Sequence, residues 1–125
     1  MAMNKDPNCI FCKIIAKEIP AEIVFEDENF LAFMDINPRA PGHVQVIPKE
    51  HCRWVWDVSK AGEYFEVVKK IALAQKKAFN QEIVHGRIEG KQVYHAHFWV
   101  YPDSETAGDK NDFKNNAKKI RDEIK

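Results

Sequence analysis

The sequence has no excess of charge of either sign and no long apolar run. Its 125 residues include 19 Lys and Arg and 19 Asp and Glu, so the formal net charge is zero. This balance argues against nucleic-acid duplexes and acidic membranes as main partners. No apolar stretch approaches the roughly 20 residues of a membrane-spanning helix, and residues 1–8 lack the apolar segment of a signal peptide. We therefore expect a cytoplasmic protein that does not associate with membranes.

Cysteine is scarce and odd in number, with Cys9, Cys12 and Cys52 alone. In a chain without a secretion signal, metal ligands or free thiols are more typical than structural disulfides. The chain also lacks internal repeats, low-complexity tracts and linkers. Its length suits one domain with a single core. We expect a flexible N-terminus over residues 1–8 and one domain over residues 9–125.

Hydrophobic periodicity and turn residues predict a mixed α+β chain. Ser59 is a plausible N-cap for a long helix that reaches about residue 80. Shorter helices are expected over residues 9–17 and 112–124, and strands over residues 22–26, 30–35, 44–47, 82–87 and 93–101. Because most of these strands follow one another through short turns, we expect an antiparallel sheet with helices packed on one face.

The last predicted strand carries two histidines that are two residues apart. Residues i and i+2 of a strand point to the same face. His95, His97 and Trp99 would then share one face of the sheet. The other face would be apolar and lie on the core, with Tyr94, Ala96, Phe98 and Val100.

Cys9 and Cys12 form a C-x2-C pair, which allows two thiolates from one tight turn to bind one metal. His51 and His95 would complete a tetrahedral Cys2His2 shell, a composition that zinc favours in structural sites. Spacing alone leaves two alternatives open, namely two free thiols or a redox pair. Cys52 is expected to be a packed or partly exposed thiol outside this site.

His97 is the candidate catalytic residue. A neutral imidazole nitrogen attacks phosphorus well, and an ordinary histidine is largely neutral at pH 7. A strand would hold the ring rigidly, and a backbone carbonyl could fix its tautomer. The structural alternative is a half-buried histidine whose hydrogen bonds are satisfied within the fold.

Several motifs in the right order resemble the histidine-triad (HIT) nucleotide-binding proteins, in particular their prokaryotic zinc-containing branch. The resemblance runs from Cys9 to Pro102, about three quarters of the chain. The motifs that carry it are Cys9–Ala21, Phe25–Asp27, Leu31–His43, Val46–His51 and Tyr94–His97.

This resemblance implies a five-stranded antiparallel sheet with a long central helix and short terminal helices, which usually dimerises through its sheets. It implies that Cys9, Cys12, His51 and His95 bind a structural zinc and that His97 forms a nucleotidyl-histidine intermediate. It further implies a purine nucleotide such as AMP or GMP as ligand and no redox cofactor.

The resemblance also assigns a nucleotide pocket. Asp35 would bind the ribose hydroxyls, because a carboxylate can accept two hydrogen bonds. The base would lie in an apolar slot formed by Phe11, Ile14, Phe33 and Ile36. The alternatives are that Phe33 and Ile14 belong to the core and that Asp35 caps the turn at residues 37–38.

The chain departs from the family pattern at the third histidine of the triad, where it has Trp99. The family histidine binds phosphate and assists the leaving group, whereas tryptophan has one N–H donor and does not titrate near pH 7. His85 and Gln92 also stand at positions where the family usually has other phosphate-binding residues. Both can donate hydrogen bonds, so all three are expected to line the substrate site.

Three functions therefore compete. The first is an enzyme that hydrolyses or transfers nucleoside monophosphate groups from phosphoramidates or dinucleoside polyphosphates through His97. The second is a zinc-stabilised nucleotide-binding module whose catalysis is weak or lost because of Trp99. The third is a zinc-stabilised structural or interaction protein without a nucleotide role.

Overall fold

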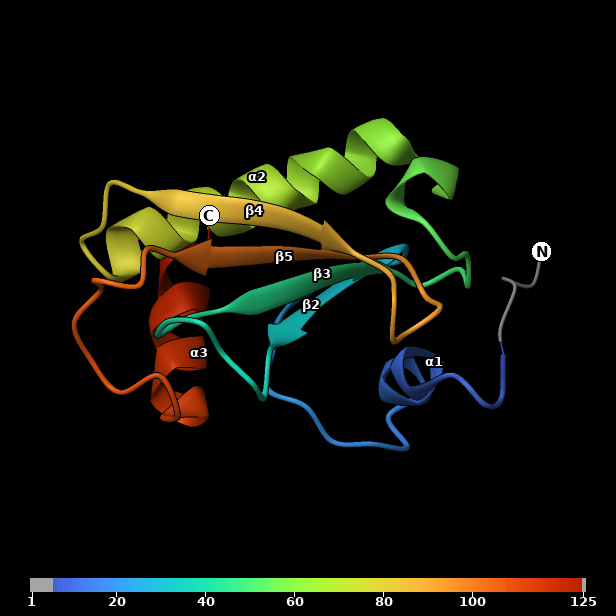
Figure 1. Cartoon of the computed structure of the whole chain (residues 1–125), viewed down its shortest axis with the longest axis horizontal. Coiled ribbons are helices and arrows are strands. Elements are labelled where there is room, and N and C mark those ends of the chain that lie inside the picture. The colour runs from blue at the N-terminus through green and yellow to red at the C-terminus, as the bar shows by residue number, and fades with distance from the viewer. Residues whose placement is uncertain (1–5, 125) are drawn as a thin grey trace.

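A five-stranded antiparallel sheet forms the centre of the computed structural model, which describes residues 6–124 (Figure 1). The strands are β1 (Ile23–Glu26), β2 (Phe30–Met34), β3 (Val44–Pro48), β4 (Val84–Glu89) and β5 (His97–Pro102). The helices are α1 (Ile10–Ile15), α2 (Ala61–Ala78) and α3 (Phe113–Glu123), with a short 3-10 turn η1 (Val55–Asp57). The predicted α+β class and the five-stranded sheet are confirmed.

The strand order is β1-β2-β3-β5-β4, so β5 lies between β3 and β4. Gln45 of β3 lies opposite Trp99 of β5, and Glu89 of β4 lies opposite His97. Residues that lie directly opposite each other in neighbouring strands share a face of the sheet. The register therefore gathers these four side chains on one face.

Helices cover both faces of the sheet, so the prediction that they pack on one face is wrong. Phe30, Ala32 and Met34 of β2 belong to a core with α2 and α3. Leu31 and Phe33 of the same strand belong to a second core with α1. Alternate residues of a strand point to opposite faces, and every residue of β2 is buried.

The helix α2 lies along the sheet and is anchored by two buried polar side chains. The Tyr64 hydroxyl donates to the carbonyl oxygen of Val46 at 2.7 Å. Gln75 Nε2 donates to the carbonyl oxygens of Gly42 and Val100, both at 2.8 Å. These bonds satisfy groups that would be costly to bury unpaired and fix α2 against β3 and β5.

Ser59 does not cap α2, contrary to the sequence-based expectation. The N-cap is Lys60, whose side chain makes no capping hydrogen bond. The Ser59 hydroxyl and backbone N–H instead donate to the Glu50 carboxylate, each at 2.8 Å. At the other end, Asn80 adopts the left-handed conformation with a φ of 48°, which is a common way to end a helix.

The strand predicted over residues 93–101 begins at His97 in the structure. The preceding residues bond to the segment after β3 instead: the Ala96 N–H donates to the Cys52 carbonyl at 2.6 Å. Tyr94 is 56% exposed, and the Cζ atom of Arg53 lies 3.7 Å from the centroid of the Tyr94 ring. The expectation that Tyr94 faces the core is therefore wrong, whereas Ala96 and Val100 do belong to it.

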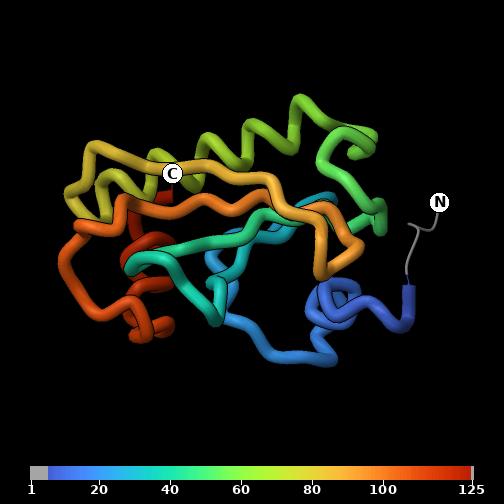
Figure 2. Tube along the Cα trace, in the orientation of Figure 1, coloured from blue at the N-terminus to red at the C-terminus, as the bar shows by residue number. Residues whose placement is uncertain are grey.

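The helices α1 and α3 lie toward opposite ends of the sheet, as the tube trace makes clear (Figure 2). Before α1, the Cys9 N–H donates to the Asp6 carbonyl at 3.1 Å, which closes a turn. The rest of the predicted flexible N-terminus, residues 1–5, lies outside the described residues. Within residues 6–124, no helix has the length and apolarity to cross a membrane.

Candidate functional site

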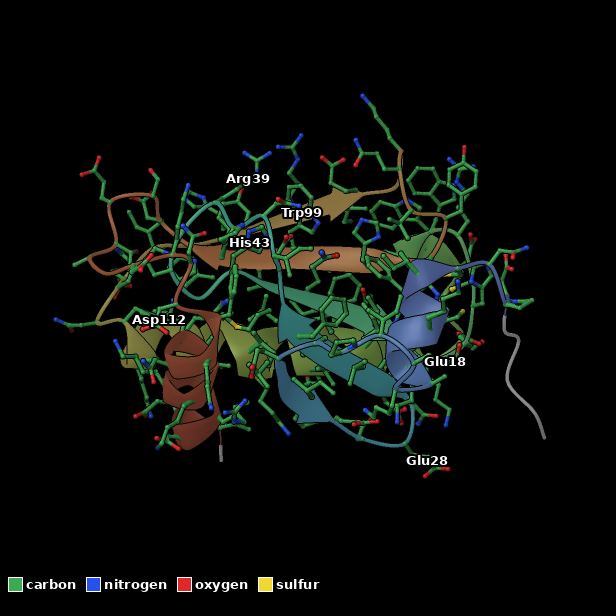
Figure 3. The ribbon with its side chains drawn as sticks, turned by 90° about the horizontal axis from the view of Figure 1, so that it is seen from below. Glu18, Glu28, Arg39, His43, Trp99 and Asp112 are labelled. Atoms are coloured by element: carbon green, nitrogen blue, oxygen red, sulfur yellow. The ribbon has the colours of Figure 1, made fainter. Side chains whose placement is uncertain are left out.

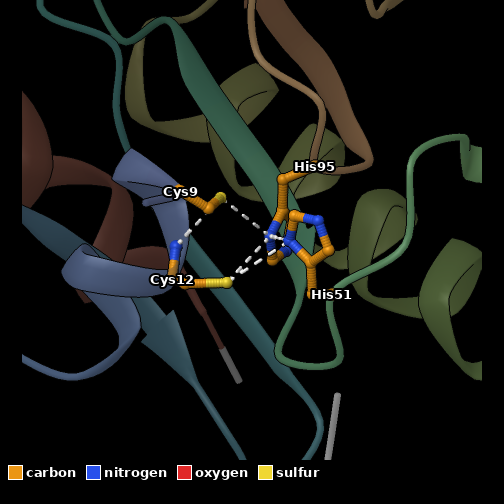
Figure 4. A group of neighbouring side chains, drawn as sticks. All are labelled: Cys9, Cys12, His51 and His95. Carbon is orange, nitrogen blue, oxygen red and sulfur yellow. Dashed lines mark hydrogen bonds between the residues drawn. The ribbon is translucent and has the colours of Figure 1, made fainter. Parts of the chain in front are cut away.

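Four side chains from three separate segments meet between α1 and the sheet. Their potential ligand atoms all lie within 4.8 Å of one another, and they are the predicted metal ligands Cys9, Cys12, His51 and His95 (Figure 4). The first two come from the start of α1. His51 follows β3, and His95 precedes β5.

The distances within this cluster fit a tetrahedral metal site. Nδ1 of His51 and Nδ1 of His95 are 3.2 Å apart. Cys12 Sγ lies 3.4 Å from His51 Nδ1, and both sulfurs lie 3.5 Å from His95 Nδ1. Zinc bond lengths of about 2.0 Å to nitrogen and about 2.3 Å to sulfur give tetrahedral edges of about 3.3 Å between nitrogens and about 3.5 Å between nitrogen and sulfur. The four residues can therefore hold one metal ion.

His95 has the tautomer that a metal ligand needs. Its Nε2 lies 2.7 Å from the Pro48 carbonyl oxygen, which can only accept a hydrogen bond. The Nε2 therefore carries the proton, and Nδ1 presents a lone pair to the cluster.

Burial favours the neutral forms of His95 and Cys12 in the absence of a cation. It lowers the pKa of His95 to about 4 and raises the pKa of the Cys12 thiol to about 11. A bound metal would stabilise the thiolate form and so displace the thiol proton.

A pocket of about 460 Å³ lies next to the cluster, and His97 forms part of its wall. The Nδ1 of His97 donates to the carbonyl oxygen of His95 at 2.7 Å, which leaves Nε2 as the ring nitrogen that is free to react. The ring of Phe11 meets the ring of His97 edge-on, with centroids 5.2 Å apart. Burial lowers the pKa of His97, so the imidazole is neutral at pH 7.

Asp35 lies at the end of β2 and also lines the pocket. Its Oδ1 accepts from the Asn37 N–H at 2.8 Å, so it does cap the following turn. Its Oδ2 accepts from Gln45 Nε2 at 3.1 Å and lies 3.5 Å from Nε2 of His43. The carboxylate is thus buried, held in place from both sides, and still part of the pocket wall.

The other predicted substrate residues divide into two groups. Five of the predicted residues line the pocket in addition to His97, namely Phe11, Asp35, Ile36, Gln92 and Trp99. Ile14 and Phe33 do not line it, because they are buried in the core beneath α1. His85 also lies outside it, exposed on β4, where Nε2 is 2.9 Å from Asp103 Oδ1.

Trp99 lies on the pocket wall, and two guanidinium groups lie near its ring. The Cζ atoms of Arg39 and Arg87 are 5.0 Å and 5.6 Å from its ring centroid, and His43 meets its edge (Figure 3). Its Nε1 is buried and finds no hydrogen-bond partner within residues 6–124. Its one donor is therefore turned away from solvent.

Sequence reasoning missed several residues of this pocket, which are Ile10, Asn37, Arg39, Gln45, Glu89, Lys91 and Val93. A register argument could have found two of them. Gln45 is a polar residue in a mostly apolar strand, and it lies opposite Trp99, while Glu89 lies opposite His97. The others come from loops and from the exposed side of α1, whose positions depend on tertiary packing.

An α+β sheet that carries a Cys2His2 cluster beside a pocket with a histidine in its wall defines the class of protein. The HIT domain family matches residues 16–106. This match spans most of the chain, which therefore belongs to the HIT family.

Solved structures and curated relatives agree with this placement. A Hit-like protein involved in cell-cycle regulation from Bartonella henselae is 39% identical, with a TM-score of 0.85 over 95% of this chain and 98% of that one. A zinc-bound histidine triad family protein from Mycobacterium smegmatis is 26% identical, with a TM-score of 0.80 over 94% of this chain and 93% of that one. The adenosine 5′-monophosphoramidase HNT1 of Saccharomyces cerevisiae is 37% identical over 78% of this chain and 63% of its own length.

Proposed function

We propose that this protein is a nucleotide hydrolase or transferase that cleaves nucleoside monophosphate groups from phosphoramidates or related compounds. The observation that carries the proposal is the hydrogen bond from His97 Nδ1 to the His95 carbonyl at 2.7 Å. It fixes the tautomer in which Nε2 is an unprotonated nucleophile on the wall of a pocket. The phosphoramidase activity of the yeast relative supports the same chemistry.

The reaction has two steps. Nε2 of His97 attacks the α-phosphorus, a nitrogen–phosphorus bond forms, and the bond to the leaving amine breaks. The amine takes its proton from solvent, because Trp99 has no group that titrates near pH 7. Water then attacks the phosphorus and loses a proton to solvent, the bond to His97 breaks with Nε2 left neutral, and the nucleoside monophosphate leaves.

The nucleotide would bind along the pocket wall. Asp35 would accept hydrogen bonds from the ribose hydroxyls, and a purine would rest on Ile10, Phe11 and the exposed Ile36. An apolar slot buries a flat base without reading its edges, so AMP and GMP are both suitable ligands. Gln92 and Trp99 belong to the same wall, and His85 would act only on groups that extend beyond it.

We assign zinc to the Cys2His2 cluster and give it a structural role. All four positions of a tetrahedral shell are filled by protein ligands, which is typical of structural zinc and leaves no open position for a substrate. The zinc-bound relative supports this choice of metal. The reaction needs no redox cofactor, since no electron is transferred.

We further propose a homodimer that works in the cytoplasm. The strand β4 is at the edge of the sheet, and an edge strand leaves backbone groups free for pairing with another chain. Phe65 and Leu73 of α2 are exposed apolar residues that a partner subunit would cover. Sedimentation velocity would measure the oligomeric state.

The proposed cytoplasmic location is supported by the cysteines, because thiols that serve as metal ligands suit a reducing compartment.

The test is AMP release from adenosine 5′-phosphoramidate by the wild-type protein and by His97→Ala. We expect release by the wild type and none by the variant, with AMP binding to the variant, measured by calorimetry, as the control for folding. Equal release by both proteins would overturn the assignment of His97.

The second candidate function is nucleotide binding with weak or lost catalysis, and Trp99 favours it. Its only donor, Nε1, is buried and cannot assist a leaving group. The variant Trp99→His separates the two functions. Activity that appears only in the variant supports the binding module, whereas wild-type turnover that the variant hardly changes supports the enzyme.

A further inference from the structure

A second pocket adjoins the first on the far side of Arg39. It has a volume of about 480 Å³ and is lined by Pro38, Arg39, His85, Tyr101, Ser104 and Lys110. Arg39 lines both pockets. A ligand that fills the first pocket and extends past Arg39 therefore enters the second.

Arg39 is held at this boundary from two sides. Its backbone N–H donates to Nδ1 of the buried His43 at 3.0 Å. Its guanidinium carbon lies 5.0 Å from the ring centroid of Trp99 (Figure 3), which is within the range of a cation–π contact. Within residues 6–124 the guanidinium makes no ion pair. The Arg39 backbone is thus held at the boundary, and its guanidinium carries a positive charge that is available to an anion.

The strand β5 leads from one pocket into the other. His97, Trp99 and Tyr101 alternate along β5, so their side chains share one face of the sheet. Two residues of a strand span about 7 Å, so Tyr101 lies about 13 Å along the strand from His97. A leaving group must therefore be several atoms long to reach the second pocket from phosphorus bound at His97.

The second pocket carries more positive than negative charge. Lys110 makes no ion pair within the described residues. His85 is bonded to Asp103 at 2.9 Å, so this carboxylate is directed at His85. The Ser104 hydroxyl and the Tyr101 ring complete the wall. Two cations with a hydroxyl and an aromatic ring are suited to bind an anionic group.

We infer that the second pocket is a subsite for the leaving group, and that it selects a leaving group that carries its own anion, either a carboxylate or a phosphate. This inference rests on the proposed function of His97. The bond that breaks joins the α-phosphorus to the near end of the leaving group. The anion at its far end changes no bond and binds Arg39 and Lys110.

Three adenosine 5′-phosphoramidates test the inference. Their leaving amines are 6-aminohexanamide, 6-aminohexanoate and 6-aminohexyl phosphate, which have the same chain length and differ in the terminal group. The measurement is the kcat/KM of each anionic compound divided by that of the neutral amide. We expect a ratio of about 5 for the wild type, as one partly exposed charge pair gives, and a clearly smaller ratio for Lys110→Gln, in which Arg39 alone remains to bind the anion. The matched control is Lys114→Gln, an exposed lysine of α3 that lines neither pocket, which keeps the wild-type ratio.

Each outcome decides a separate point. Equal ratios in the wild type and Lys110→Gln overturn the subsite. A larger ratio for one of the two anionic compounds identifies that anion as the preferred one. If no compound is cleaved by the wild type, the proposed function fails, and calorimetric affinities of the same three compounds for wild type and Lys110→Gln then decide on the subsite. A preference for anionic compounds that is clearly smaller in the variant supports it, and an equal preference in both proteins overturns it.

Discussion

The carbonyl oxygen of His95 accepts the hydrogen bond from Nδ1 of His97 at 2.7 Å, while the ring of His95 belongs to the Cys2His2 cluster. One residue therefore contributes its side chain to the Cys2His2 cluster and its backbone carbonyl to the orientation of the His97 ring. Its Nε2 is fixed in turn by the Pro48 carbonyl at the end of β3. The Cys2His2 cluster and His97 are consequently linked through a single residue, His95.

Removal of the metal is expected to destabilise the protein. A chelator should lower the melting temperature by at least about 10 °C, because a tightly bound structural metal contributes several kcal/mol to the folded state. Zinc content and melting temperature are the measurements. Cys12→Ser should lose zinc, and Cys52→Ser, which leaves the cluster intact, should keep it. Full zinc content in Cys12→Ser would contradict the assigned ligand set.

Asp35→Asn is expected to remove recognition of the ribose. In the wild type, we expect AMP to bind about tenfold more tightly than 2′,3′-dideoxy-AMP, because hydrogen bonds to a charged group contribute about 1.5 kcal/mol. In the variant, the two ligands should bind with similar affinity, and calorimetry measures all four constants. A variant that still distinguishes them would exclude the carboxylate as the ribose ligand.

His43 is expected to make stability depend on pH. Burial lowers its pKa to about 4, with Asp35 and Arg39 as its charged neighbours and Tyr101 against its ring. In the unfolded chain this histidine binds a proton near pH 6.5, whereas in the folded protein it does so only near pH 4. The contribution of His43 to the free energy of unfolding is therefore complete above pH 6.5 and is lost as the pH falls toward 4. The loss amounts to at most about 3 kcal/mol.

The comparison with His43→Gln isolates this effect, because other buried histidines titrate in both proteins. The difference in free energy of unfolding between wild type and variant should be largest at pH 7 and should shrink steadily down to pH 4. Urea unfolding at several pH values measures it. A difference that stays constant with pH would show that His43 does not titrate differently in the two states.

Two glycine substitutions should change stability in opposite directions. Gly42 has a φ of 84°, and a Cβ there would lie 2.2 Å from the Phe79 ring, so Gly42→Ala should cost about 1–3 kcal/mol. At Gly62, in the first turn of α2, a Cβ would meet nothing within 4 Å. Gly62→Ala should therefore stabilise by about 0.4–1 kcal/mol. Denaturation midpoints that move in the same direction would contradict this reading of the backbone.

The sequence predicted most of the elements because their signals are local. The apolar runs of β2 and β3, the helical periodicity of α2 and Asp112 at the start of α3 are each contained within one segment. The start of β5 was placed too early, because the backbone N–H of Ala96 bonds to Cys52 in the loop after β3 instead of to a neighbouring strand. No pattern within residues 93–96 indicates this partner.

The sequence does allow the prediction that helices cover both faces of the sheet. The run Phe30–Met34 is apolar at every position, which is typical of a strand buried on both sides. The pocket was harder to predict, since Arg39 and Lys91 are exposed loop residues and only the folded chain brings them to His97.

The expected N-cap of α2 was wrong for a similar reason. The Ser59 hydroxyl donates to Glu50, which lies nine residues away, instead of capping the helix.

The two-sided burial of β2 has a consequence for how the molecule opens. A fluctuation that lifts α1 exposes one core, and one that detaches α2 or α3 exposes the other, but β2 contributes side chains to both. We therefore expect those amide hydrogens of β2 that bond to β3 to exchange with solvent deuterium only through global unfolding, because β3 is an inner strand of the sheet. The amides of α1, which close a short helix over the metal cluster, would exchange through a smaller and more frequent opening.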